Sequence, residues 1–231
     1  MEFGIIAAMQ KEAAGLLEKM QDKTETVIGG VTYTAGTLCG HTAVVAVCGV
    51  GKVFAALCAQ TMILRFAPQC IINTGVAGSL STALSIGDLV IADGAVQHDM
   101  DTSAVGDPVG LLSGINRIVL PTDRALTERL KAAAAAVGAV AHGGIVATGD
   151  RFVADAAEKR RIVDTFGAVA CEMEGGAVAQ ACFVNGVPFA LVRAISDDAS
   201  GKAQVDYPVF ADAAAKNSIA LLCAALGGEA C

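Results

Sequence analysis

Three acidic residues of this chain each follow an apolar run, at the point where a buried strand would end. Glu12 follows the first run, Glu174 closes another, and Asp197 follows the run 189–195 after Ser196. Carboxylates at strand ends lie at the mouth of an open α/β sheet, where such folds bind ligands. The pattern predicts a site that moves protons and holds hydroxyl groups without a metal ion.

Asp197 is the candidate general acid. Because it ends an apolar run, its carboxyl group would be partly desolvated, and desolvation gives a carboxyl group the proton affinity that a general acid needs near neutral pH. The alternative is that Asp197 and Asp198 simply begin a polar loop. Glu12, one turn into the first helix, would by itself most often be a surface charge.

Glu172 and Glu174 lie two residues apart, so at a strand end they point to the same side. We interpret Glu172 as a solvated charge that opens the next helix, where negative charge is favourable. Glu174 is the better functional candidate, because Met173 and the glycines that follow leave room for a substrate. Arg193, inside the last strand, fits either an internal ion pair or a contact with a ligand.

Two glycines and an aromatic residue lie at other strand ends. Gly75 and Gly78 allow the backbone to approach a ligand closely. Phe152 follows the turn Gly149-Asp150-Arg151 and presents an aromatic face suited to stacking on a planar ring. The alternative is a helix-entry turn that contributes one core phenylalanine.

Alternating strands and helices must position these residues. Apolar and β-branched runs predict strands at residues 3–8, 26–28, 31–39, 42–48, 70–74, 88–97, 139–147, 168–172 and 188–196. Periodic or Ala-rich segments predict helices at residues 11–20, 49–66, 122–137, 154–166, 175–185 and 207–226. Loops are expected at residues 75–79, 99–115 and 148–152. This order predicts a single-domain α/β fold whose largely parallel sheet is covered by helices on both faces.

Composition excludes several classes of protein. The chain has 231 residues, of which 54% are hydrophobic and 17% charged, as is typical of one folded domain. The net charge of −7 comes without a basic stretch, which argues against nucleic acid or an acidic membrane as a partner. The N-terminal segment lacks the features of a secretory signal, and turn residues interrupt the uncharged stretches. We therefore expect a cytoplasmic protein without membrane spans.

Several familiar motifs are absent. The eight cysteines include no C-x-x-C pair and the three histidines are isolated, so no zinc spacing emerges and buried free thiols are expected. Val53 stands where a P-loop needs Ser or Thr, and Phe54 stands where a dinucleotide fingerprint needs Gly. Ser79 lacks the flanking glycines of a nucleophile elbow.

Seven short segments and Glu12 lie along nearly the whole chain in the order and at the spacing of a known family. They are GIIAAM at 4–9, GVGK at 49–52, INTGVAG at 72–78, GD at 87–88, TGDRF at 148–152, EME at 172–174 and RAISD at 193–197. Together they resemble the purine-nucleoside phosphorylase/uridine phosphorylase superfamily, and within it the 5′-methylthioadenosine/S-adenosylhomocysteine nucleosidases.

The resemblance implies a three-layer sandwich with a central mixed, largely parallel sheet. It also implies hydrolysis of the N-glycosidic bond of an adenine nucleoside through an oxocarbenium-like transition state. In this scheme Asp197 is the general acid at adenine N7, Glu12 activates the attacking water, and Glu174 with Met173 holds the ribose hydroxyls.

The resemblance further implies that Phe152 stacks on adenine while backbone groups near Phe152 and Val153 recognise its edge. The other implied substrate contacts are Ala8, Val50, Gly78, Arg193 and Ser196. The family implies a small-molecule substrate, no cofactor, no metal ion, and a homodimer with residues 99–115 near the shared interface.

This sequence departs from the family pattern at three positions. The family often has Ser at the position of Val76, Gly at that of Ser79, and an aromatic residue near Val105 that reaches the 5′-substituent pocket of a neighbouring subunit. These departures leave the predicted acids intact and reshape the wall around the 5′-substituent.

Three alternatives remain. A nucleoside phosphorylase would use phosphate in place of water and needs converging arginines, but Arg65 is the only arginine in the first third of the chain. An aminodeoxyfutalosine hydrolase would use the same acids. A non-catalytic nucleoside-binding protein would share the fold, and the presence of Glu12, Glu174 and Asp197 speaks against it.

Overall fold

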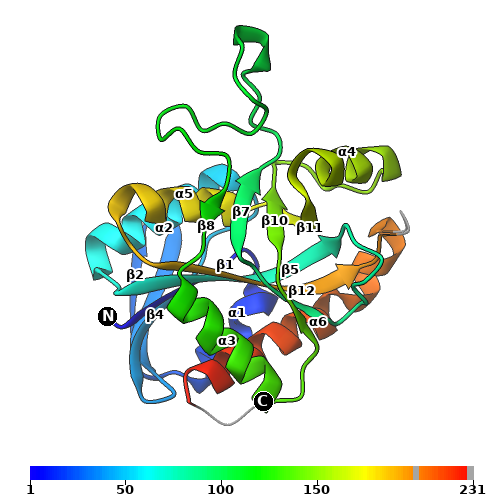
Figure 1. Cartoon of the computed structure of the whole chain (residues 1–231). Coiled ribbons are helices and arrows are strands. Elements are labelled where there is room, and N and C mark those ends of the chain that lie inside the picture. The colour runs from blue at the N-terminus through cyan, green and yellow to red at the C-terminus, as the bar shows by residue number, and fades with distance from the viewer. Residues whose placement is uncertain (200–202, 228–231) are drawn as a thin grey trace.

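The computed structural model describes residues 1–199 and 203–227, and all of its strands join one 12-stranded sheet (Figure 1). The strands are β1 (Phe3–Ala7), β2 (Gln21–Ile28), β3 (Val31–Leu38), β4 (His41–Val47), β5 (Cys70–Ser79), β6 (Leu89–Ile91), β7 (Gly94–Gln97), β8 (Leu120–Pro121), β9 (Ala141–His142), β10 (Ile145–Thr148), β11 (Ala168–Glu172) and β12 (Phe189–Asp197). The helices are α1 (Gln10–Lys19), α2 (Lys52–Phe66), η1 (Ser103–Val105), α3 (Arg124–Ala136), α4 (Ala156–Phe166), α5 (Gly175–Asn185) and α6 (Ala203–Ala225).

The sheet is mixed, as expected. Its main path runs β2-β3-β4-β1-β5-β11-β10-β7-β8, and β12 also pairs with β5. The described strands form six parallel and five antiparallel pairs. Both β1 and β12 run parallel to the central strand β5, so their carboxyl ends meet at one edge of the sheet.

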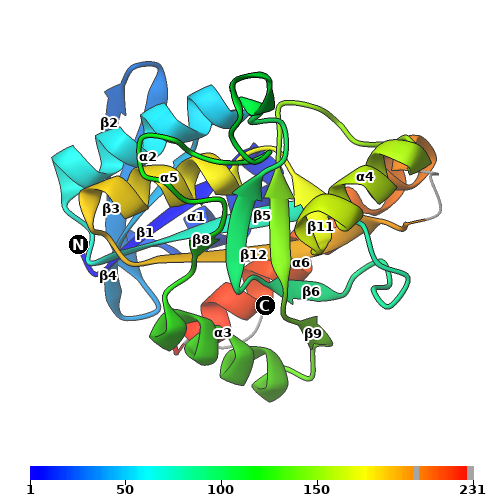
Figure 2. The same ribbon diagram turned by 45° about the horizontal axis from the view of Figure 1, so that its top comes forward.

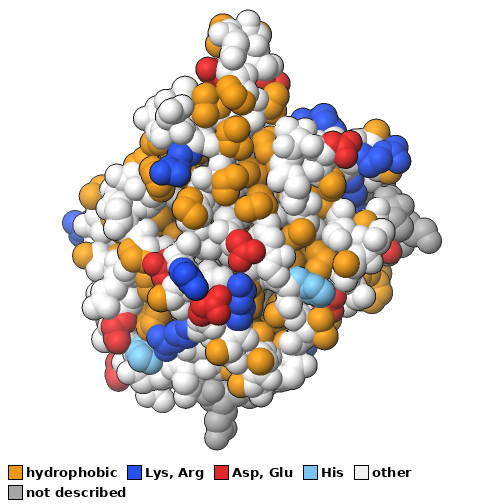
Figure 3. Space-filling model, in the orientation of Figure 1, with side chains coloured by type: hydrophobic (Ala, Val, Ile, Leu, Met, Phe, Trp, Pro, Cys, Tyr) orange, Lys and Arg blue, Asp and Glu red, His pale blue; other side chains and the backbone are white. Residues whose placement is uncertain are grey.

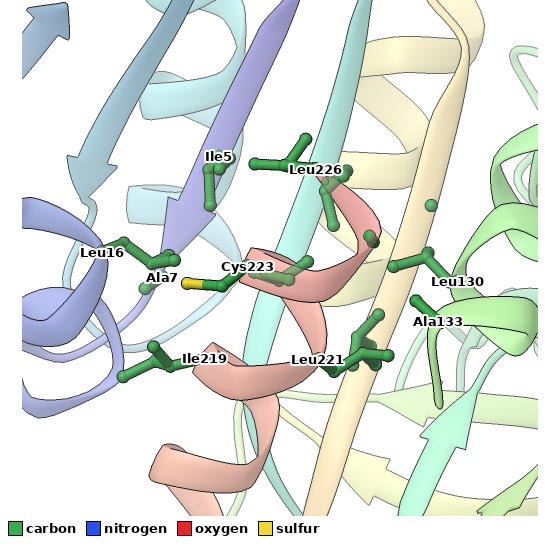
Figure 4. Packing of buried hydrophobic residues seen from close by; sticks show 14 of the residues in the cluster. Ile5, Ala7, Leu16, Leu130, Ala133, Ile219, Leu221, Cys223 and Leu226 are labelled. Carbon is green, nitrogen blue, oxygen red and sulfur yellow. The ribbon is translucent and has the colours of Figure 1, made fainter. Parts of the chain in front are cut away.

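Helices cover both faces of the sheet, which completes the three layers (Figure 2). Helices α2 and α5 pack on one face, α1, α3 and α6 pack on the other, and α4 lies against β10 and β11. In the core between α6 and the sheet, Leu16 from α1, Leu130 from α3 and Leu221 from α6 are fully or almost fully buried (Figure 4).

Burial explains why some strands were easy to predict and others were not. All nine residues of β12 are buried, since helices cover both of its faces, and its sequence is correspondingly apolar. The edge strand β2 begins at Gln21, five residues before the predicted start at residue 26. Its first half carries exposed polar and charged side chains, so it lacks the apolar pattern by which a strand is predicted. Charged side chains of this kind protect an edge strand from pairing with other chains.

The expected loop at residues 75–79 is wrong, because β5 continues through Ser79. Residues 75–77 pair with β12, while Gly78 pairs with Cys171 of β11. The expected strands 88–97 and 139–147 are each divided. The chain changes partners near Asp93, whose N–H donates to the carbonyl of Gly144. The last helix begins at Ala203, four residues earlier than expected.

Residues 99–119 leave the body between β7 and β8 as a protruding arm (Figure 1). Apart from η1 and an antiparallel bridge between Leu112 and Arg117, the arm is irregular, as the sequence predicts for residues 99–115. Val105 in η1 is 82% exposed, and hydrophobic side chains are visible along the arm (Figure 3). Asp99 anchors its base, because the Asp99 carboxylate lies 2.6 Å from Nζ of Lys52 at the start of α2.

The cysteines of the described residues are free thiols, as predicted, and six of the seven are buried. Cys39 is half-buried, and Cys231 lies outside the described residues. None of the helices in the described part of the chain has both the length and the apolar character that a membrane span requires.

Candidate active site

A pocket opens where β1 and β12 end, beside the last residues of β5. It encloses roughly 470 Å³ of empty space, including open solvent at its mouth. Nine of the residues expected at the site line it: Ala8, Glu12, Val50, Gly78, Phe152, Met173, Glu174, Ser196 and Asp197. Val153 lines a small adjoining pocket, which shares Gly78 and Asp197 with the first.

Glu12 is buried at the amino end of α1 and does not lie on the surface. Its Oε2 accepts hydrogen bonds from the backbone N–H groups of Ala8 (3.0 Å) and Met9 (2.8 Å), and its Oε1 accepts one from Val76 (3.1 Å). Burial raises the pKa of Glu12 above its ordinary value, although the Arg193 charge and these N–H groups oppose the shift. The carboxylate is therefore held in one orientation with a raised affinity for a proton.

Gly75 makes room for this carboxylate. A Cβ atom at Gly75 would lie 2.7 Å from Oε1 of Glu12 and 3.4 Å from Nη1 of Arg193. The small-residue run of β5 therefore lets its backbone approach the carboxylate of Glu12 closely. The sequence predicts such a close approach to a ligand.

Glu174 immediately precedes α5 and faces the same pocket. The N–H of Gly51, just before α2, donates to its Oε1 at 2.8 Å. Burial, together with the negative charge of Glu172, raises the pKa of Glu174 to about 7, although Arg193 opposes the shift. Two carboxylates with raised proton affinity thus border one pocket.

The interpretation of Glu172 as a solvated charge is wrong. Its side chain is 2% exposed and forms an ion pair with the guanidinium of Arg193. Glu172 does serve the start of α5, since its Oε2 accepts the N–H groups of Glu174 (2.9 Å) and Gly175 (2.7 Å). A hydroxyl donated by Thr148 completes its partners. A buried carboxylate is retained here because several donors satisfy it.

For Arg193 the structure favours the internal ion pair over a ligand contact. The side chain is 1% exposed and is absent from the described residues that line the pocket. Its Nη2 donates to Glu172 and to Oδ1 of Asn73 (2.7 Å), and lies 3.8 Å from Oε2 of Glu174. Arg193 therefore positions the carboxylates from behind the pocket wall.

Asp197 ends β12 and is 2% exposed. Oγ of Ser196 donates to its Oδ1 at 3.0 Å, while Nζ of Lys159, in α4, lies 3.5 Å from its Oδ2. Gly78 packs directly against the carboxyl group, because a Cβ atom there would lie 2.8 Å from Oδ2. No sequence pattern indicates Lys159, which resembles an ordinary surface lysine in a charged helix.

The remaining wall of the pocket is apolar. Phe152 is half exposed at the mouth and Met173 is partly buried, whereas Val153 behind them is buried. Phe152 is therefore too exposed to be the core phenylalanine of the alternative interpretation. Val76 lines the pocket without a hydroxyl, and the hydroxyl of Ser79 instead donates to the carbonyl of Ser81.

The chemistry available in the pocket is proton transfer. Two buried carboxyl groups, Glu12 and Asp197, come from different elements and border one cavity that also has apolar side chains in its wall. Within residues 1–199 and 203–227, no group of three or more His, Cys, Asp or Glu side chains is placed to hold a metal ion.

The chain is similar to known proteins in both sequence and fold. Residues 2–227 match the Phosphorylase superfamily. A 5′-methylthioadenosine/S-adenosylhomocysteine nucleosidase of Shewanella halifaxensis is 36% identical over 227 residues, covering 98% of this chain and 99% of the relative. The nucleosidase of the same name from Neisseria meningitidis, solved with methylthio-immucillin-A, has a TM-score of 0.94 at 35% identity, with 98% and 99% of the two chains covered. The futalosine hydrolase of Helicobacter pylori has a TM-score of 0.93 at 35% identity and 97% coverage of both chains.

Proposed function

Because this chain belongs to the Phosphorylase superfamily and matches nucleosidases of that family from end to end, we propose that it is an N-glycosyl hydrolase. Its proposed substrates are 5′-methylthioadenosine and S-adenosylhomocysteine, from which it releases adenine and the 5′-substituted ribose. The observation that carries the proposal is the meeting of Glu12 and Asp197 in one pocket, where they can flank one nucleoside.

In the proposed reaction the bond between C1′ and adenine N9 breaks, and its electron pair leaves with the base. Asp197 gives its proton to N7, so that adenine departs as a neutral molecule. Glu12 accepts a proton from the water whose oxygen bonds to C1′. Each such proton transfer contributes typically ~10²–10⁴-fold to the rate. The raised proton affinity of Glu12 that burial causes suits its role as a base.

The other pocket residues receive binding roles. Glu174 and Met173 hold the ribose hydroxyls, and Phe152 stacks on adenine beside the backbone of Val153. Gly78 forms the floor under Asp197. The remaining contacts come from Ala8, Val50 and Ser196. Arg193 acts through its ion pairs with the carboxylates.

Water is the proposed nucleophile. A phosphorylase must bind an anion where this enzyme would bind water, and none of the described residues lining the pocket is basic. Arg65 is exposed on α2, away from those residues. The four buried acidic side chains in the wall, Glu12, Glu172, Glu174 and Asp197, would also repel phosphate.

A second candidate is hydrolysis of futalosine or a related nucleoside. The observation that favours it is the similarity to the Helicobacter pylori futalosine hydrolase, which equals the similarity to the Neisseria meningitidis nucleosidase in identity and nearly in TM-score. The same acids would serve both kinds of nucleoside, so a comparison of rates on the two substrates distinguishes the candidates.

We also propose that the protein is a cytoplasmic homodimer. Val53 and Leu57 on α2 and Val184 on α5 are exposed around a surface groove of roughly 1010 Å³, open solvent included. The exposed Val105 of the arm adds apolar surface outside the body. Burial of these side chains against a second copy would stabilise a dimer. Light scattering of the purified protein tests this.

The test of the proposed function is adenine release from purified protein. We expect release from 5′-methylthioadenosine and S-adenosylhomocysteine without phosphate, and an unchanged rate when phosphate is added. Strict dependence on phosphate would identify a phosphorylase. Faster release from a futalosine-type substrate would establish the second candidate, and no release from any nucleoside in the panel would refute hydrolysis.

A further inference from the structure

Lys159 is a buried cation outside the pocket. It lies in the first turn of α4, which Asp155 caps by accepting the N–H groups of Ala157 (3.0 Å) and Glu158 (2.9 Å). Lys159 and Ile162 share the buried face of that helix. Lysine is almost never fully buried unless its charge is compensated, yet Lys159 is only 4% exposed.

The compensation comes from the end of β12. Nζ of Lys159 donates to the carbonyl oxygen of Asp198 at 2.8 Å and lies 3.5 Å from Oδ2 of Asp197. On the other side of the same carboxyl group, Ser196 donates to Oδ1 at 3.0 Å. The ammonium group thus sits beside one oxygen of Asp197 while a hydroxyl orients the other.

Lys159 is absent from the described residues that line the two pockets beside Asp197. It therefore acts on a substrate only through Asp197. Asp197 itself borders both pockets, and Gly78 packs against it so closely that the carboxyl group has little room to move.

We propose that Lys159 is a positioning residue that stabilises the negative charge left on Asp197 when Asp197 protonates the departing purine. This inference rests on the proposed function. The proton moves from the carboxyl group to the purine nitrogen, the bonding electrons of the glycosidic bond go to the base, and Asp197 becomes a carboxylate. Lys159 keeps its own proton throughout and supplies a fixed positive charge beside the new anion.

Such a fixed charge is effective because it is already oriented before the reaction. In a buried, weakly polarisable surrounding, a preorganised donor aimed at a developing charge is worth roughly 10²–10³-fold in kcat. Water could not replace it easily, since both Lys159 and Asp197 are almost fully buried.

The competing explanation is purely architectural, namely that Lys159 ties α4 to the end of β12. Substrates with different leaving groups separate the two explanations. Adenine needs a proton to leave as a neutral molecule, whereas 4-nitrophenolate leaves readily as an anion. A loss of charge stabilisation on Asp197 therefore affects only the adenine substrate, while a misshapen site affects both.

The experiment compares the wild type with Lys159→Met, Lys159→Gln and Lys159→Arg on 5′-methylthioadenosine and on the 4-nitrophenyl glycoside of 5-methylthioribose. For Lys159→Met and Lys159→Gln we expect kcat on the nucleoside to fall roughly 100-fold. The rate on the nitrophenyl glycoside should change less than about 3-fold, because that reaction needs no general acid. Lys159→Arg should recover most of the lost activity.

Lys131→Met is the matched control, because Lys131, on α3, forms a half-exposed ion pair with Asp93, away from the pocket. It should leave both rates unchanged. Equal losses on both substrates, or an unchanged nucleoside rate in a folded Lys159→Gln protein, would overturn the inference while the proposed function stands. If the wild type itself releases no adenine, the proposed function fails and the inference falls with it. If neither neutral variant folds, a Lys159→Arg protein with equal losses on both substrates overturns it.

Discussion

Replacing Glu12 by glutamine keeps the shape of the side chain and removes its charge. In the wild type, three backbone N–H groups donate to the carboxylate, those of Ala8 and Met9 to Oε2 and that of Val76 to Oε1. A glutamine has only one oxygen. If that oxygen accepts the N–H groups of Ala8 and Met9, the NH₂ group of the glutamine faces the N–H of Val76. The buried N–H of Val76 then has no acceptor.

The stability cost follows from this geometry. A buried donor without a partner costs about 1–3 kcal/mol. The neutral side chain also relieves the burial penalty that raises the pKa of Glu12, so we expect the low end, about 1 kcal/mol. For a chain of this length, that lowers Tm by about 2–4 °C. The protein therefore stays folded at room temperature.

The effect on catalysis is expected to be far larger. Loss of the proposed base should lower kcat for adenine release by roughly 10²–10⁴-fold. Glu18→Gln is the matched control, since Glu18 lies exposed on the same helix and undergoes the same chemical change. Adenine release and thermal melting are measured on all three proteins. A Glu12→Gln protein that keeps more than about a tenth of the wild-type kcat would refute the reasoning.

Three further predictions concern the rest of the pocket. Gly78→Ala should fold and lose roughly 10- to 100-fold in kcat, because its Cβ atom would lie 2.8 Å from Oδ2 of Asp197 and displace the acid; an unchanged kcat in a folded protein would contradict this. Phe152→Ala should raise KM about 5-fold, the low end of ~1–3 kcal/mol for stacking on a base, because the ring is half exposed; an unchanged KM would exclude the stacking role. Burial raises the pKa of Glu174 from 4.5 to about 7, so the folded protein binds this proton more tightly than the unfolded chain, and the free energy of unfolding should fall as the pH rises between these values. Denaturant unfolding across this pH range should show a weaker fall in Glu174→Gln, and identical pH dependence in the two proteins would count against the shift.

Much of the pocket could be predicted because its residues follow apolar runs. The run before Asp197 is entirely buried as β12, so its end had to reach the edge of the sheet. The same argument located Glu12 after β1 and Glu174 after β11. Strand ends of a sheet meet at one edge, which brings residues from distant parts of the sequence together.

The partners behind the pocket could not be predicted in the same way. The ion pair between Glu172 and Arg193 joins β11 to β12, and those two strands do not pair with each other among the described residues. Local sequence shows only an acid before a helix and an arginine in a strand. The one available signal was Arg193 itself, because a cation inside an otherwise apolar strand requires a buried acid nearby.

Lys159 was missed for a related reason. It belongs to a run of three basic residues in α4, where Arg160 and Arg161 are exposed. Its burial depends on the packing of α4 against the end of β12. Its spacing of three residues from buried Ile162 was consistent with a shared helix face, but a lysine at such a position is usually a solvated one.

The continuation of β5 through Ser79 was also hidden from the sequence. Its glycines normally weaken a strand. Here β12 and β11 provide the hydrogen-bonding partners, and the side chains of Glu12 and Asp197 occupy the space that Cβ atoms would fill. Residues 75–79, for which the sequence predicts a loop, are therefore the part of the sheet that touches both proposed acids.

The most direct test of the whole account is the rate of adenine release by Asp197→Asn on 5′-methylthioadenosine, measured beside its melting curve. If Asp197 donates a proton to the departing purine, the variant melts like the wild type and kcat falls by at least ~10²-fold. A folded variant that releases adenine at the wild-type rate would show that the base leaves without help from this residue.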